Sequence, residues 1–357
     1  MEGRVYLAAA LDGLGSHPAA WRRADVPPTE LFDPGRIVAM ARLAERGMLD
    51  FVTLDDQFPS APEPGHLHGA LDAWLALTHA AGHTTRLGLF PTGVAHGDPA
   101  VMAARAVTLD RIAAGRGGWR PRVALSDEER RRATADPERY AAFTEERFAQ
   151  ADAFVAAVAE FWDSWREESL TDVRRVEPDG RHPGASLYAR VPTPASGRPL
   201  TAVLAHFSTP YRLAARHADI VFVTPFDRED VVAIRAELAG LCTELRRVPT
   251  PLTVLADLNV ILAETDSEAA ARKRELDRWV PFSSDAATFT GTPDKLADLI
   301  EEWHRDGGVD GFRIRPAVLS EDLTATVEGL VPLLRERGLL TADHGLPLRG
   351  RIRRNTA

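Results

Sequence analysis

Short apolar runs alternate with longer amphipathic stretches along most of this chain. Residues 4–11 (RVYLAAAL) and 50–54 (DFVTL) are short and apolar, which is typical of buried strands. Between them, residues 34–47 place apolar side chains at helical spacing from Ile37 to Ala44, behind an initial proline. The pattern predicts a strand, a helix and a second strand, which together form a βαβ unit.

The same alternation continues almost to the end of the chain. Further strands are predicted at residues 86–91, 119–125, 200–205, 220–224, 252–262 and 311–315, and further helices at 70–81, 99–113, 139–166, 210–217, 228–246, 267–279, 293–306 and 323–337. A stretch rich in glycine and proline, residues 176–198, interrupts the alternation and is typical of a loop or hairpin.

This element order predicts an α/β protein with a single (β/α)8 TIM barrel. Eight βα units over roughly 340 residues favour a barrel over a doubly wound sheet, and no GxGxxG follows the first strand. We expect the barrel to occupy residues 1–340, with an irregular excursion at about 176–198 before the fifth strand. Residues 341–357 are expected to form a C-terminal tail.

Charge and composition exclude several functions. The chain has 52 acidic and 43 basic residues, a formal net charge of −9, which argues against a nucleic-acid partner. Lys273 and Lys295 are the only lysines, and neither lies in a Walker A phosphate loop. The single cysteine, Cys242, and the lack of a long apolar stretch predict a cytoplasmic protein without metal or membrane anchor. The basic run at residues 349–355 is expected to be a solvated end.

Candidate chemistry follows the predicted strands, because the active site of such a barrel lies at the carboxyl ends of its strands. Polar residues at these ends include Asp12, His17, Asp55, Asp56, Thr92, Arg120, Arg122, His206, Ser208, Thr224 and Arg315. Asp55 and Asp56 suggest a paired-carboxylate hydrolase, but neighbouring strand residues point to opposite faces, so only one of them can face the mouth. His17 is a candidate general base, since histidine titrates near physiological pH.

Motifs along nearly the whole chain resemble one enzyme family. They include HPAAWR at residues 17–22, LAERGMLDFVTLDD at 43–56, TTRLGLFPTG at 84–93, AARAVTLDRIAAGRGGW at 103–119 and GRPLTAVLAHFS at 197–208. The chain resembles the luciferase-like flavin-dependent monooxygenases, in the branch with the nitrilotriacetate, dibenzothiophene sulfone and streptogramin-type enzymes. The resemblance implies a barrel, usually dimeric, that binds reduced FMN from a separate flavin reductase and uses it with O2 on a small organic substrate. A homodimer or a heterodimer with a paralogue is expected.

The resemblance also assigns site residues by position. Asp56 matches the family's acidic flavin contact after the second strand, and Thr92 matches its flavin-contacting threonine after the third. Ser208 matches the serine that contacts the cofactor phosphate, and His17 is expected in the pocket as the catalytic residue. Arg120, in GWRP, stands where the family has an asparagine beside the flavin ring.

Other positions depart from the family pattern. A histidine and a tyrosine before the long helix are replaced by Thr144 and Phe148, while a rival alignment keeps Tyr140 but puts Asp136 in place of the histidine. The family's long insertion after the seventh strand is reduced to a link at residues 280–288. The active site is therefore expected to be more open than in the family, or covered by a partner subunit.

The phosphate loop departs as well, and this leaves two alternatives open. In AHFSTPY, His206 and Tyr211 replace two glycines, and a side chain there obstructs the approach of an anion, although His206 or Arg212 could compensate by charge. One alternative is a flavin-free barrel that acts as a non-catalytic subunit or as a cofactor-independent enzyme. The other is an oxidoreductase that uses the deazaflavin F420, whose acidic tail would meet Arg120.

Overall fold

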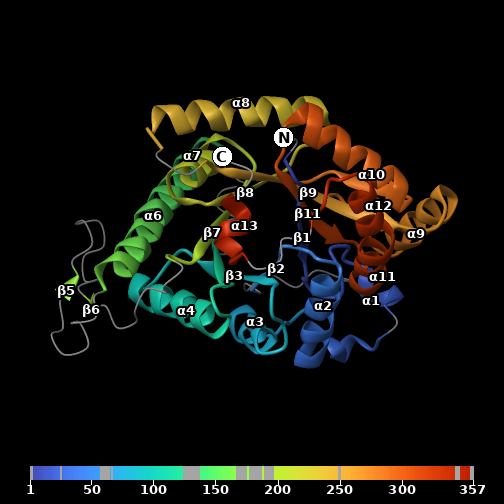
Figure 1. Cartoon of the computed structure of the whole chain (residues 1–357), viewed down its shortest axis with the longest axis horizontal. Helices are drawn as coiled ribbons and strands as arrows, with labels where there is room; N and C mark the ends of the chain where they lie inside the picture. The colour runs from blue at the N-terminus through green and yellow to red at the C-terminus, as the bar shows by residue number, and fades with distance from the viewer. Residues whose placement is uncertain are drawn as a thin grey trace.

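The strands of this chain close into a barrel. The computed structural model describes residues 3–24, 26–56, 65, 67–123, 137–165, 175–176, 187–188, 197–247, 251–341 and 346–353. The barrel strands are β1 (Tyr6–Ala10), β2 (Phe51–Leu54), β3 (Gly88–Val94), β4 (Gly118–Arg122), β7 (Leu200–Ala205), β8 (Ile220–Val223), β9 (Thr253–Leu262) and β11 (Gly311–Pro316). Each pairs in parallel with the next, and β11 pairs with β1 to close the ring (Figure 1). The predicted (β/α)8 barrel is confirmed.

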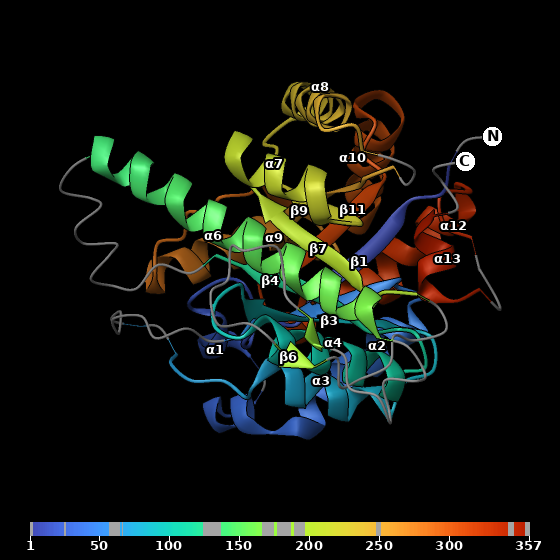
Figure 2. The same cartoon turned by 90° about the vertical axis from the view of Figure 1, so that its left-hand side faces the viewer.

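Helices surround this ring (Figures 1 and 2). They are α1 (Ala20–Arg23), α2 (Pro34–Arg46), α3 (Ala73–Ala81), α4 (Pro99–Ile112), α6 (Pro137–Ser164), α7 (Ser208–His217), α8 (Arg228–Glu244), α9 (Asp266–Trp279), α10 (Pro293–Glu302), α11 (Leu319–Ala325), α12 (Val331–Glu336) and α13 (Leu348–Arg353). Shorter turns of 3-10 or π type occupy Pro28–Phe32, Trp303–Gly307 and Thr326–Leu330. Within the described ranges, none of the helices has the length and apolar character to cross a membrane.

Two features differ from the sequence expectation or extend it. The link at residues 280–288 leads into a further strand, β10 (Thr288–Gly291), which pairs with β9 outside the closed ring. Its four residues are too few to show a period. In the excursion, β5 (Arg175–Val176) and β6 (Leu187–Tyr188) form an antiparallel pair, as a hairpin would; its other residues up to Ser196 lie outside the described part.

Helix starts follow from capping residues in the sequence. The side chains of Asp33, Asp72, Asp98, Asp227 and Thr265 each accept a hydrogen bond from a backbone N–H in the first turn of the helix that follows. These N–H groups have no partner inside the helix, so each cap contributes about 1 kcal/mol. The caps therefore place the helix starts, and with them the loops at the barrel mouth.

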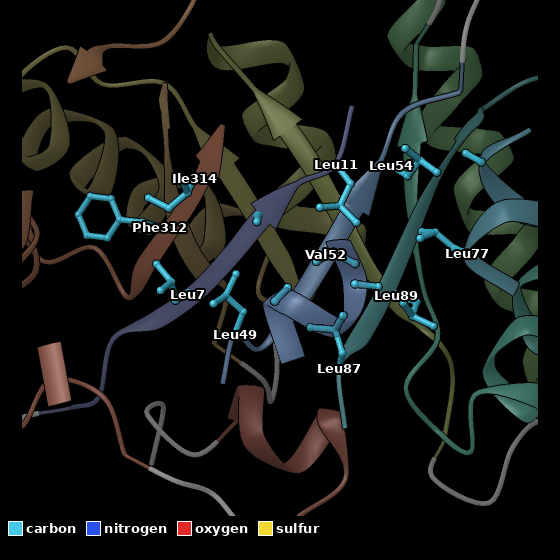
Figure 3. Packing of buried hydrophobic residues seen from close by; sticks show 14 of the residues in the cluster. Leu7, Leu11, Leu49, Val52, Leu54, Leu77, Leu87, Leu89, Phe312 and Ile314 are labelled. Atoms are coloured by element: carbon cyan, nitrogen blue, oxygen red, sulfur yellow. The ribbon is translucent and has the colours of Figure 1, made fainter. Parts of the chain in front are cut away.

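Alternate residues of the strands build an outer core against the helices. Leu7, Val52, Leu89 and Ile314 point outward from four neighbouring strands, and Leu77 of α3 packs among them (Figure 3). This period of two also determines which residues point into the barrel, namely those between the outward ones.

The inner core is apolar at the amino ends of the strands and is closed there by α13. Phe51, Phe90 and other inward side chains pack with Leu348 and Ile352 of α13, which lies at the end of the barrel where β1 begins (Figure 2). Arg351 of α13 is 1% exposed and pairs with buried Asp50. The expectation that the basic run is a solvated end is therefore wrong for its described part.

Candidate active site

Inward-facing residues become charged toward the carboxyl ends of β2, β3 and β4. Arg120 donates through Nε to Thr92 Oγ1 (3.0 Å) and pairs through Nη2 with Asp55, and Thr92 Oγ1 donates to Asp55 Oδ1 (2.8 Å). Burial alone would raise the pKa of Asp55, but the charges of Arg120, Arg313 and Arg122 outweigh it and hold that pKa well below its usual range. Asp55, Thr92 and Arg120 thus form a polar floor beneath the barrel mouth, and each of the three side chains contacts the other two.

A second ion pair joins two adjacent strands below this floor. Arg313 of β11 forms a bidentate pair with Asp257 of β9, and the two side chains are 3% and 0% exposed. The guanidinium also donates to Thr53 Oγ1 (3.3 Å) and lies 4.4 Å from the ring centre of Phe222. Burial would lower the pKa of Arg313, but Asp257 raises it overall, so the cation is permanent.

Asp12, at the end of β1, is the group with an intermediate pKa at this mouth. Its Oδ1 accepts a hydrogen bond from the backbone N–H of Asp55 (2.6 Å). Burial and the negative charge of Asp55 raise the pKa of Asp12 to about 6. Asp12 can therefore gain or lose a proton near neutral pH, whereas Asp55 stays ionised.

The rim on the opposite side carries a second polar cluster. Arg315 Nη1 donates to Asp285 Oδ1 (2.9 Å), and His206 Nε2 lies 3.5 Å from Asp285 Oδ2. The other ring nitrogen of His206 lies 3.1 Å from Thr224 Oγ1. Burial would raise the pKa of Asp285, but Arg315 and His206 hold it below its ordinary value.

His17 lies in the loop after β1 and faces α9. Its Nδ1 accepts from the N–H of Ala19 (3.1 Å), and its Nε2 lies 3.2 Å from Asp277 Oδ1, so Nε2 carries the proton. The ring also packs on Phe282, with 5.0 Å between ring centroids. Both nitrogens are occupied by protein groups in this arrangement, and the catalytic role of His17 stays a prediction.

Ser208 begins α7, and its hydroxyl donates to Glu237 of α8. Its predicted contact with a cofactor phosphate stays a prediction.

On α6, the hydroxyl of Thr144 is buried and has no hydrogen-bond partner among the described residues. One helical turn later, Phe148 packs edge to face on Phe207, with 6.0 Å between ring centroids. Since Thr144 and Phe148 lie on the same face of α6, the unsatisfied hydroxyl of Thr144 faces the loop that follows β7.

The predicted site residues are brought together only in part. Thr92 and Arg120 are in contact, whereas His17 contacts α9 and Ser208 contacts α8. Asp56 is half-buried beside Asp55. Of these two, Asp55 meets Arg120 and Thr92, a result that the shared face of Thr53 and Asp55 at i and i+2 could have indicated.

The sequence placed Asp12 at a strand end without assigning it a role, and it did not single out Asp257 or Arg313. Asp257 and Arg313 lie inside strands, where a charged residue gives no local sign that its partner is on a neighbouring strand. Both residues alternate with apolar, outward-facing residues, and this alternation could have indicated that they point into the barrel.

Comparison with known proteins identifies the family. The sequence model of the luciferase-like monooxygenase family matches residues 13–317. N-acetyl-S-(2-succino)cysteine monooxygenase of Bacillus subtilis (strain 168) is 24% identical, with 96% of this chain and 94% of the relative covered. Nitrilotriacetate monooxygenase component A of Aminobacter aminovorans is also 24% identical, with 92% of each covered.

A solved structure agrees with this assignment at the level of the fold. EDTA monooxygenase from Chelativorans sp. BNC1 superimposes with a TM-score of 0.85 at 19% identity, over 98% of each chain. The chain belongs to the luciferase-like monooxygenase family, and the resemblance predicted from its motifs is confirmed.

Proposed function

We propose that this chain is the oxygenase component of a two-component flavin-dependent monooxygenase. It takes reduced flavin, FMN by family resemblance, from a separate reductase and oxidises a small organic substrate with O2. The family match across residues 13–317 carries this proposal. Relatives named as monooxygenases, one of them as a component A, support it over more than nine-tenths of the chain.

The residues at the mouth fit the ring of a flavin better than its phosphate. Arg122 and Arg315 keep part of their guanidinium groups exposed at the ends of β4 and β11, and they can donate to the carbonyl oxygens of a flavin ring. The unsatisfied hydroxyl of Thr144 can serve a ligand as well. At the β7 end, by contrast, Ser208 already donates to the carboxylate of Glu237, which does not suit an anion.

The chain itself would bind, orient and shield, while a bound reduced flavin would supply the electrons that activate oxygen. Within the floor, Thr92 and Arg120 are buried and Asp55 is partly exposed, and the bonds among the three side chains hold this surface in place. Asp12 can hold or release a proton at its carboxyl near neutral pH. Exposed rings at the ends of β7 and β8, Phe207 and Phe226, offer apolar contact to an organic substrate.

A flavin-free barrel is the second candidate, and one observation favours it. Thr92, which the resemblance assigns to the flavin, is 0% exposed because it is covered within the contact with Arg120 and Asp55. A ligand would reach Thr92 only if Arg120 moved.

Titration with flavins separates these candidates. The purified chain is mixed with FMN, riboflavin and F420, oxidised and anaerobically reduced, while flavin absorbance and fluorescence are followed. Saturable binding of FMN or riboflavin supports the monooxygenase, and binding of F420 alone supports the deazaflavin enzyme. No binding of any of them up to about 100 μM contradicts both and supports the flavin-free barrel.

A further inference from the structure

The turn from β7 into α7 carries a carboxylate where the family resemblance puts a phosphate. The hydroxyl of Ser208 donates its proton to Glu237, which reaches across from α8. A phosphate dianion bound to Ser208 would lie against this carboxylate, and like charges at such short range repel one another. The group assigned to hold an anion therefore already has an anion as its partner.

Tyr211 fills the space that a glycine leaves in the family's loop. Its side chain is 3% exposed and packs with Val203 and Ala205 of β7. Burial, together with the charges of Glu237 and Asp230, raises the pKa of Tyr211 to about 12. The first turn of α7 thus combines a bulky ring with a local excess of negative charge.

The cations that could compensate are engaged elsewhere. His206 contacts Asp285 and Thr224, and Arg212 forms a bidentate pair with Glu244 through bonds of 2.7 and 3.2 Å. Each cation would have to leave a carboxylate partner before it could bind a phosphate at Ser208.

The backbone at this turn also offers few donors. Pro210 has no N–H, and the N–H of Tyr211 donates to the carbonyl of Phe207. Because Pro210 is the third residue of α7, the helix start lacks one of the N–H groups that it would otherwise present to an anion.

We propose that this end of the site rejects a phosphate dianion and accepts an uncharged chain that bears hydroxyl groups, so that the barrel takes riboflavin rather than FMN. The inference rests on the proposed function, because it concerns which flavin the barrel binds. Glu237 can accept a hydrogen bond from a ribityl hydroxyl, and Ser208 can accept one while it donates to Glu237. The same pair serves a neutral polyol and opposes an anion.

Glu237→Gln tests this proposal, because it removes the charge and keeps a hydrogen-bond acceptor for Ser208. The full-length wild type and the variant are titrated with riboflavin and with FMN, and dissociation constants are taken from flavin fluorescence and absorbance. Glu229→Gln is the matched control: it removes the same charge from the same helix, at a side chain that is 72% exposed and paired with Arg228.

The wild type is expected to bind riboflavin at least as tightly as FMN. E237Q is expected to tighten FMN binding about tenfold, the size of the repulsion between a dianion and a carboxylate at roughly 5 Å in a near-aqueous medium. It should not tighten riboflavin binding, because a neutral amide accepts a ribityl hydroxyl no more strongly than a carboxylate does, and E229Q should change neither constant. Binding of FMN about tenfold tighter than riboflavin in the wild type, or no gain for FMN in E237Q, overturns the proposal.

A phosphate titration distinguishes this failure from failure of the proposed function. If neither flavin binds, the proposed function is wrong, and inorganic phosphate is added to the ¹⁵N-labelled chain at constant ionic strength. Saturable shifts of the Ser208 and Thr209 amide signals in the wild type overturn the rejection of phosphate. Their absence in the wild type supports it.

Discussion

The pair of Arg120 and Asp55 is a buried interaction whose loss is measurable. Arg120→Met removes one charge from a pair in which the arginine side chain is 4% exposed and the aspartate side chain 29% exposed. Removing one partner of a fully buried pair costs about 3–5 kcal/mol. Asp55 is partly exposed, and Arg122 Nη1 lies 3.6 Å from its other oxygen. We therefore expect the free energy of unfolding to fall by about 2–3 kcal/mol.

This penalty should depend on pH, because it arises from an ionised carboxylate. In the wild type the pKa of Asp55 is held below its ordinary value, so the group adds stability above about pH 4 that is lost as the pH falls. In R120M that pKa rises, and Asp55 takes up a proton on mild acidification. The difference in stability between the two proteins should therefore shrink from about pH 7 toward about pH 3.

Urea unfolding followed by circular dichroism and tryptophan fluorescence measures both effects. Arg212→Met is the control, because Arg212 and Glu244 form an exposed pair with side chains 41% and 57% exposed. Loss of such an exposed pair should change the free energy of unfolding little, because water and salt screen it. The reasoning is refuted if R120M costs no more than R212M, or if its penalty is the same at about pH 4 and about pH 7.

Three further variants test other parts of the structure. Asp12→Asn should raise the free energy of unfolding by up to about 3 kcal/mol near pH 8 and change it little near pH 4. The reason is that the pKa of Asp12 is about 6 in the folded state, so its ionised form destabilises the fold above that pH. Equal effects at both pH values in urea unfolding would contradict this. Arg351→Ala should cost about 3 kcal/mol in urea unfolding, because this side chain is 1% exposed and pairs with buried Asp50; a cost below about 1 kcal/mol would show that α13 does not close the barrel through Arg351. His17→Ala should cost about 1–2 kcal/mol through its lost bonds to Ala19 and Asp277 and leave riboflavin binding within about twofold; a larger loss of binding would place His17 in the pocket.

Local periodicity was enough to predict the barrel. A buried strand must be short and apolar and a surface helix must be amphipathic, so residues 4–11, 50–54 and 200–205 and their counterparts identified the eight strands. Each strand and each helix satisfies its backbone hydrogen bonds with near neighbours or in a regular ladder. Such elements therefore produce a periodic pattern of apolar and polar residues that can be recognised in the sequence.

The site is predictable only in part, because its chemistry depends on partners that are distant in the chain. Thr92 and Arg120 were chosen by position and do meet, but Asp55, rather than Asp56, joins them because the pleat turns it inward. Ser208 meets Glu237, 29 residues away, on the neighbouring helix. No local period records such a contact.

The sequence by itself determined the order of the elements, the family and the end of the barrel at which polar residues collect. Tertiary structure alone decided that Arg351 is buried against Asp50 in the barrel base, and that the Ser208 hydroxyl has a carboxylate as its partner. The physical reason is that burial and electrostatics depend on which side chains are close in space. The sequence around Arg351 and Ser208 does not show that Asp50 and Glu237, which are distant in the chain, become their partners in the folded structure.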